Sequence, residues 1–104
     1  MNQVLIPLTH PGAYLQEEFL EPLGLTAYRL AKDLGVAQTR ISQILKGARA
    51  ITPATALRLA RYFGTSPEFW VNLQAQYDLD VAKEEMGERI AQEVHLRQGL
   101  ETAK

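Results

Sequence analysis

Five polar side chains in the segment 38–43 have the types that hydrogen-bond the edges of DNA bases. They are Gln38, Thr39, Arg40, Ser42 and Gln43. Glutamine can make two hydrogen bonds to adenine, arginine two to guanine, and a threonine methyl can contact thymine. The segment contains no carboxylate, which DNA phosphates would repel. We therefore predict that at least two of Gln38, Thr39, Arg40 and Gln43 read bases in the major groove.

The residues around this segment have the pattern of two crossed helices joined by a tight turn. Small or apolar residues stand where such helices must touch, namely Leu30, Ala31, Leu34, Gly35, Val36, Ile41 and Ile44. Gly35 provides the positive φ that a sharp turn after a helix requires. The pattern predicts a helix-turn-helix at residues 27–46, whose second helix enters the major groove.

The other periodic segments are also helical, so the predicted fold class is all-α with five helices in a repressor-like domain. Cap and proline signals place four helix starts after Thr9 or His10, Thr26, Thr52 and Ser66, and the third helix is predicted to run from about Ala37. The predicted helix ends are Pro22 with Gly24, Leu34 before Gly35, Lys46 before Gly47, Gly64, and a point beyond Val81. Residues 3–8 are a candidate extended arm.

The chain is predicted to form one compact domain. Its 104 residues, 46% of them hydrophobic, suffice for one core. Residues 1–82 are assigned to the helix-turn-helix domain. Residues 83–104 are a charged helical extension of it that continues the fifth helix, forms a separate helix, or frays.

Charge is segregated along the chain. Residues 26–62 carry seven basic side chains and one carboxylate, a net charge of +6, between acidic segments of −3 and −4. A basic block that coincides with the helix-turn-helix is the pattern expected for contact with phosphates. The predicted phosphate contacts are Thr26, Arg29, Lys32, Lys46 and Arg49. For Arg58 and Arg61, phosphate contact and simple exposure on the fourth helix remain equal alternatives.

The fifth helix carries the apolar face predicted for a homodimer interface. Its members, at helical spacing, are Trp70, Leu73, Tyr77 and Val81. This face is larger than a small core requires. Phe69 and Trp70 are interpreted as core or dimer packing rather than as a ligand cage.

The composition argues against several other classes of protein. There is no cysteine, and His10 and His95 lack neighbours at metal-ligand spacing, so no metal or cofactor is predicted. No catalytic motif is present, so an enzyme is not expected. The start lacks the basic region of a signal peptide, and no apolar run is long enough to span a membrane. We therefore expect a cytoplasmic protein.

The sequence resembles the phage-repressor type of helix-turn-helix and, more closely, the HigA antitoxins. The resemblance covers about residues 8–82. The segments that carry it are His10-Pro11-Gly12, Glu18-Phe19-Leu20-Glu21-Pro22-Leu23-Gly24, Leu30-Ala31, Leu34-Gly35-Val36, Arg40-Ile41-Ser42, Ile44-Leu45, Gly47, Ile51-Thr52, Ala56-Leu57-Arg58-Leu59-Ala60 and Phe63-Gly64-Thr65-Ser66-Pro67-Glu68-Phe69-Trp70.

The resemblance implies an all-helical homodimer that represses its own operon and neutralises a HigB-type ribonuclease toxin. Its operator would be an inverted repeat in double-stranded DNA. Two alternatives remain at this point. One is a protein-interaction module whose helix-turn-helix no longer binds DNA, and the other is a regulator of unrelated genes without a toxin partner.

Overall fold

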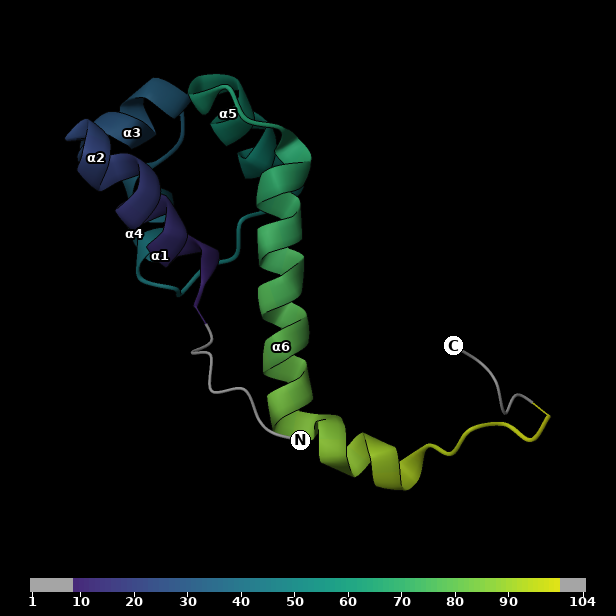
Figure 1. Cartoon of the computed structure of the whole chain (residues 1–104). Helices are drawn as coiled ribbons and strands as arrows, with labels where there is room; N and C mark the ends of the chain where they lie inside the picture. The colour runs from purple at the N-terminus through teal and green to yellow at the C-terminus, as the bar shows by residue number, and fades with distance from the viewer. Residues whose placement is uncertain (1–8, 100–104) are drawn as a thin grey trace.

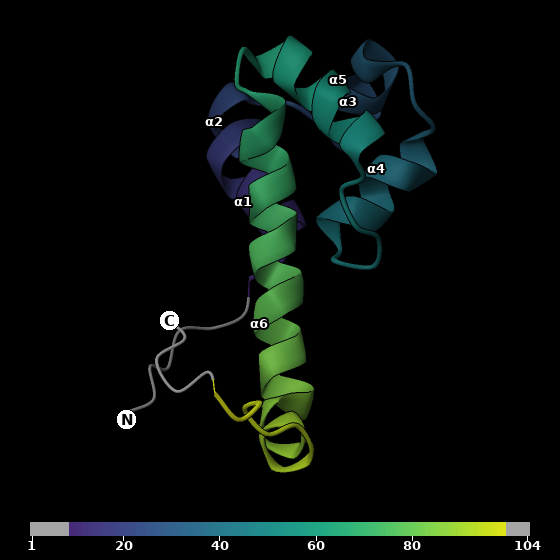
Figure 2. The ribbon, with the colours of Figure 1, turned by 90° about the vertical axis from the view of Figure 1, so that its right-hand side faces the viewer.

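The computed structural model describes residues 9–99, so the candidate arm at residues 3–8 lies outside the described part of the chain. Within residues 9–99 the chain folds into five successive helices, which confirms the all-α prediction. A cluster of short helices surrounds one end of the long helix α6 (Pro67–Glu93), and the rest of α6 extends away from it (Figures 1 and 2). The molecule is therefore elongated, about 54 Å in its longest dimension.

The first helix includes Pro22 and ends at Gly24, the later of the two residues at which the sequence predicted its end. It comprises α1 (Pro11–Leu15), a π-helical turn η1 (Gln16–Leu20) and α2 (Glu21–Leu23). In the wide turn, the Glu21 N–H donates to the carbonyl oxygen of Gln16. Proline in a regular helix clashes with the carbonyl four residues earlier and offers no N–H. The wide turn directly before Pro22 accommodates both effects, and the helix ends at Gly24, with φ of 66°.

The next three helices begin close to their predicted starts. They are α3 (Ala27–Leu34), α4 (Gln38–Leu45) and α5 (Pro53–Phe63). The hydroxyls of Thr26 and Thr52 accept hydrogen bonds from backbone N–H groups three residues later. Such caps satisfy N–H groups that a helix start leaves without a partner.

A single core joins all five helices. Its fully buried members come from each of the five helices, and include Leu15, Leu20, Leu30, Ile41, Ile44, Leu59 and Trp70. The Trp70 ring lies against Phe19, Phe63 and Phe69, with centroid separations of 5.2, 6.4 and 4.9 Å. Its indole N–H donates to the Thr65 hydroxyl at 2.8 Å. This aromatic cluster fixes α6 against the first helix and α5.

Three alternatives were considered for the segment after residue 82, and α6 shows which of them applies as far as residue 99. It continues the fifth helix without a break to Glu93, and residues 94–97 are not helical. The predicted boundary between residues 82 and 83 falls inside this helix. No helix within residues 9–99 combines the length and apolar character needed to cross a membrane.

Candidate nucleic-acid interface

Helix α4 has one face in the core and another in solvent. Ile41 and Ile44 are 0% exposed. Gln38, Thr39 and Gln43 are exposed, whereas Arg40 and Ser42 are half-buried. All five predicted base-reading side chains therefore retain accessible surface, with the three exposed ones the most accessible.

The start of α4 has no side-chain cap, because its N-cap position is Ala37. The other helices of residues 9–99 begin with a capping side chain, such as Thr26, Thr52 or Ser66. The first N–H groups of a helix have no partner within it, and the helix dipole gives them partial positive charge. In α4 these donors adjoin Gln38 and Thr39.

The position of α4 depends on a close contact with α1. A Cβ atom added at Gly12 would lie 1.8 Å from the Ile44 carbonyl oxygen, a separation that no side chain can have. Gly12 is buried, and its N–H donates to Nδ1 of His10 at 2.9 Å. The absence of a side chain at Gly12 thus lets the backbone of α1 approach the C-terminal end of α4.

The predicted base reader Gln43 contacts the predicted phosphate ligand Arg49. Arg49 Nε donates to Gln43 Oε1 at 2.8 Å, and both residues are exposed. The bond holds the loop after α4 against the exposed face of α4. It also leaves the Gln43 amide nitrogen as the donor available on that side chain.

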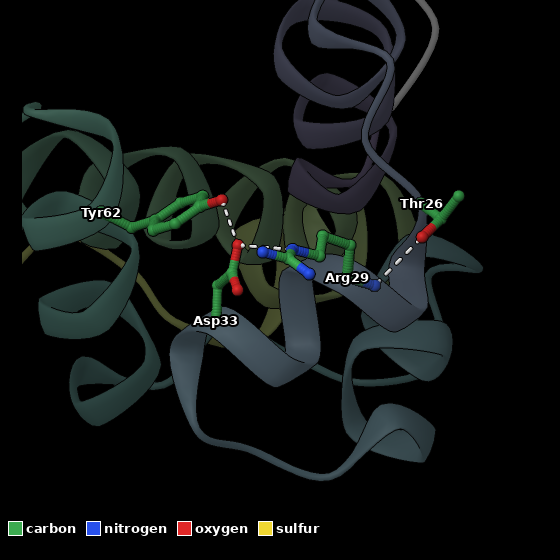
Figure 3. A network of polar contacts seen from close by, with 4 residues as sticks. All are labelled: Thr26, Arg29, Asp33 and Tyr62. Atoms are coloured by element: carbon green, nitrogen blue, oxygen red, sulfur yellow. Dashed lines mark hydrogen bonds and ion pairs between the residues drawn. The ribbon is translucent and has the colours of Figure 1, made fainter.

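A second polar network lies on α3 and α5 (Figure 3). Asp33 Oδ2 accepts from Arg29 Nε at 3.3 Å and from the Tyr62 hydroxyl at 2.6 Å, while Thr26 Oγ1 caps α3 through the Arg29 N–H at 3.0 Å. The hydrogen bond from Tyr62, with the charge of Arg29 adding to it, lowers the pKa of Asp33. The same bond raises the pKa of Tyr62. Arg29 is thus directed toward Asp33 while remaining largely exposed.

The structure distinguishes the roles of Arg58 and Arg61 on α5, for which the sequence offered two alternatives. Arg58 Nη1 donates to the Leu34 carbonyl oxygen at 2.8 Å and so closes the C-terminal end of α3. Arg61 is exposed, as are the predicted phosphate ligands Lys32 and Lys46. Arg58 therefore has a structural role. Predicting it would have required knowing that the C-terminal end of α3 faces α5.

The predicted dimer face needs one correction. Trp70 is 0% exposed in a single protomer, so it lies in the core and does not contribute to an accessible surface. Leu73, Tyr77 and Val81 are half-buried on α6. Their remaining surface is available to a partner. The spacing of apolar residues could not reveal that three other aromatic rings cover Trp70.

Sequence reasoning also missed three polar residues around the interface. Asp33 and Tyr62 restrain Arg29, and Gln74 holds the loop between α4 and α5. Asp33 carried one usable signal, because it is the single carboxylate of the basic block. The other two pair with residues more than 20 positions away, and local patterns do not report such contacts.

Comparisons with known proteins agree with this geometry. The pattern of the helix-turn-helix family matches residues 17–70, which include α3, α4 and α5. A solved HigA-family addiction module antidote protein from Coxiella burnetii is 46% identical, with a TM-score of 0.84 over 88% of this chain and 100% of that one. This chain belongs to the HigA family of helix-turn-helix proteins.

Two further comparisons cover most of this chain. Pseudomonas aeruginosa antitoxin HigA, solved with the higBA promoter, is 37% identical with a TM-score of 0.84, over 86% of this chain and 97% of that one. Virulence-associated protein I of Dichelobacter nodosus is 49% identical over 77% of this chain and 74% of that protein. The similarity thus extends beyond the helix-turn-helix into α6.

Proposed function

We propose that this protein is an antitoxin that represses its own operon by binding operator DNA in the cytoplasm. The observation that carries the proposal is the exposed, carboxylate-free face of α4, held in place by buried Ile41 and Ile44. The match to a HigA solved with its promoter supports the same conclusion. The binding assay below separates one alternative, an interaction module, from this proposal; the other, a regulator without a toxin, differs from it in lacking a toxin partner.

Helix α4 enters the major groove with its N-terminal half toward the bases. Gln38, Thr39 and Gln43 reach base edges directly, and Arg40 and Ser42 contact bases or the adjoining backbone. Phosphate contacts come from Thr26, Arg29, Lys32, Lys46 and Arg49, together with the open N–H groups at the helix starts.

A homodimer places two copies of α4 on an inverted repeat. Half-sites in such operators are separated by about one helical turn of DNA, roughly 34–36 Å, or a multiple of it. The exposed parts of Leu73, Tyr77 and Val81 on α6 form the dimer surface.

The toxin partner is a HigB-type ribonuclease. The distal half of α6 offers a surface for it, since Glu84, Glu85, Glu88 and Glu93 are exposed and outnumber Lys83 and Arg89. Such an acidic helix attracts a basic partner and speeds association.

The experiment is a binding assay of the purified protein with a fragment of its own promoter at several salt concentrations. With about six to eight phosphate contacts, a plot of the log of the association constant against log salt should have a slope of roughly −5 to −7. Binding without a salt response would contradict the DNA-binding role. Failure to bind DNA, with tight binding to the product of a neighbouring gene, would favour the interaction module.

A further inference from the structure

A buried side chain of α6 holds the loop that follows the recognition helix. Gln74 is 7% exposed, and its Oε1 accepts from the Ile51 backbone N–H at 2.8 Å. Its Nε2 donates to Asp78 Oδ1 at 2.9 Å. Gln74 and Thr55 are the two polar side chains buried within residues 9–99.

The hydrogen bond from the Ile51 N–H to Gln74 lies in the protein interior. The Ile51 side chain is 3% exposed and belongs to the core, so its backbone N–H is shielded from water. A buried N–H without a partner is costly, which makes Gln74 the group that allows residue 51 to stay buried. The hydrogen bond to Asp78 fixes the orientation of the Gln74 amide, with oxygen toward the loop.

The same loop carries groups proposed to bind DNA. Residues 46–52 include Lys46 and Arg49, and Arg49 in turn bonds to Gln43 on the exposed face of α4. Contacts therefore run from Asp78 and Gln74 on α6, through Ile51 and the loop, to Gln43. Outside this loop, α1 also holds α4, but it does so through packing at Gly12.

We propose that Gln74 is a positioning residue for operator binding, which holds the loop at residues 46–52 in the conformation that contacts DNA. This inference rests on the proposed function. It predicts that operator affinity depends on a hydrogen bond between the loop and α6, outside the surface that touches DNA.

The first variant is Gln74→Met, which keeps the length of the side chain and removes both hydrogen bonds. Its matched control is Gln76→Met on the exposed side of the same helix, where Gln76 Nε2 bonds to Asp80 at 2.9 Å without touching the loop. We expect Gln74→Met to weaken operator binding about five- to tenfold, the effect of one lost hydrogen bond. The control should stay within about twofold of wild type.

A second variant separates positioning from a general loss of stability. In Gln74→Glu the new carboxylate lies beside Asp78, and the two repel each other. The double variant Gln74→Glu/Asp78→Asn keeps the acceptor for Ile51 and supplies an amide at position 78 that donates to the new carboxylate. Operator affinity should fall in the single variant and recover in the double variant.

Hydrogen exchange of the Ile51 amide distinguishes a local effect on the loop from a general loss of stability, which would speed exchange throughout the protein. In Gln74→Met this amide should exchange faster while amides of α3 and α5 keep their protection, and the salt slope of binding should not change. Wild-type affinity in Gln74→Met, measured with folded protein, would overturn the positioning role. Failure of the wild-type protein to bind its promoter would instead overturn the proposed function.

Discussion

Arg49 and Gln43 form a 2.8 Å hydrogen bond across the surface assigned to DNA contact. One residue was predicted to anchor the phosphate backbone and the other to read a base. Because they contact each other, the conformation of each depends on the other before DNA binds.

Gln43→Ala should relax base preference at one position by about 1–3 kcal/mol, whereas Arg49→Ala should weaken binding to all sequences alike and reduce the salt slope by about one. Because the two side chains are hydrogen-bonded to each other, their effects on operator binding should not be independent. Operator binding by both single variants and the double variant should show a coupling energy of about 0.5–1 kcal/mol. Additive effects, or identical behaviour of the single variants across a library of sites, would contradict these roles.

Asp33→Asn should strengthen operator binding. The substitution keeps an oxygen that accepts from Arg29 and Tyr62 but removes the one negative charge of the basic block. We expect a steeper salt slope, by up to about one. Asp80→Asn on α6 makes the same change of charge away from the helix-turn-helix. Equal effects of the two substitutions on operator affinity would rule out a specific role for Asp33.

Gly12→Ala should destabilise the fold, because its Cβ would overlap the Ile44 carbonyl oxygen. Forcing α1 away from α4 should cost about 1–3 kcal/mol or more of the free energy of unfolding. Gly87→Ala is the control, since its Cβ would meet only the Lys83 side chain at 4.0 Å, an ordinary contact. Urea denaturation should show this control to be more stable than wild type by about 0.5–1 kcal/mol. Equal stability of Gly12→Ala and wild type would refute the close approach.

His10 should make folding stability depend on pH in mildly acidic solution. Burial lowers its pKa below the ordinary 6.5, against the smaller opposing effect of Asp78, and its neutral Nδ1 accepts the Gly12 N–H. The folded state therefore binds fewer protons than the unfolded state as pH falls below 6.5, and stability decreases there. The ring also lies against Tyr77, with centroids 5.0 Å apart.

The measurement for His10 is urea denaturation at about pH 7.5 and about pH 5.5. His10→Asn retains a capping side chain without the titrating ring. Wild type should lose more stability than this variant between the two pH values. Equal losses would show that His10 does not contribute the pH dependence.

The sequence predicted those parts of the fold that depend on local chemistry. The threonine and serine caps and the glycine turn at Gly35 are set by a few adjacent residues, and the helices begin where these signals stand. The predicted end of the first helix at Pro22 and Gly24 lies at Gly24, because the π-helical turn before Pro22 relieves the clash that a proline normally causes in a helix.

Parts of the site that depend on distant pairs could not be predicted. Trp70 was interpreted as core or dimer packing, and only the convergence of Phe19 and Phe63 on its ring decides for the core. Arg58 faces the end of α3, 24 residues away, and Gln74 faces Ile51 at a separation of 23. The type of a side chain alone does not show whether it hydrogen-bonds a distant residue or faces solvent.

The most direct test of the account places a carboxylate on the exposed face of α4. Operator binding by Thr39→Glu should be compared with Gln92→Glu, which adds the same charge on exposed distal α6, with circular dichroism confirming that both variants fold. We predict that Thr39→Glu loses about a hundredfold or more in affinity, because like charges brought together cost several kcal/mol. Gln92→Glu should bind about as well as wild type. Undiminished binding by folded Thr39→Glu would contradict the central claim that this face of α4 enters the DNA groove.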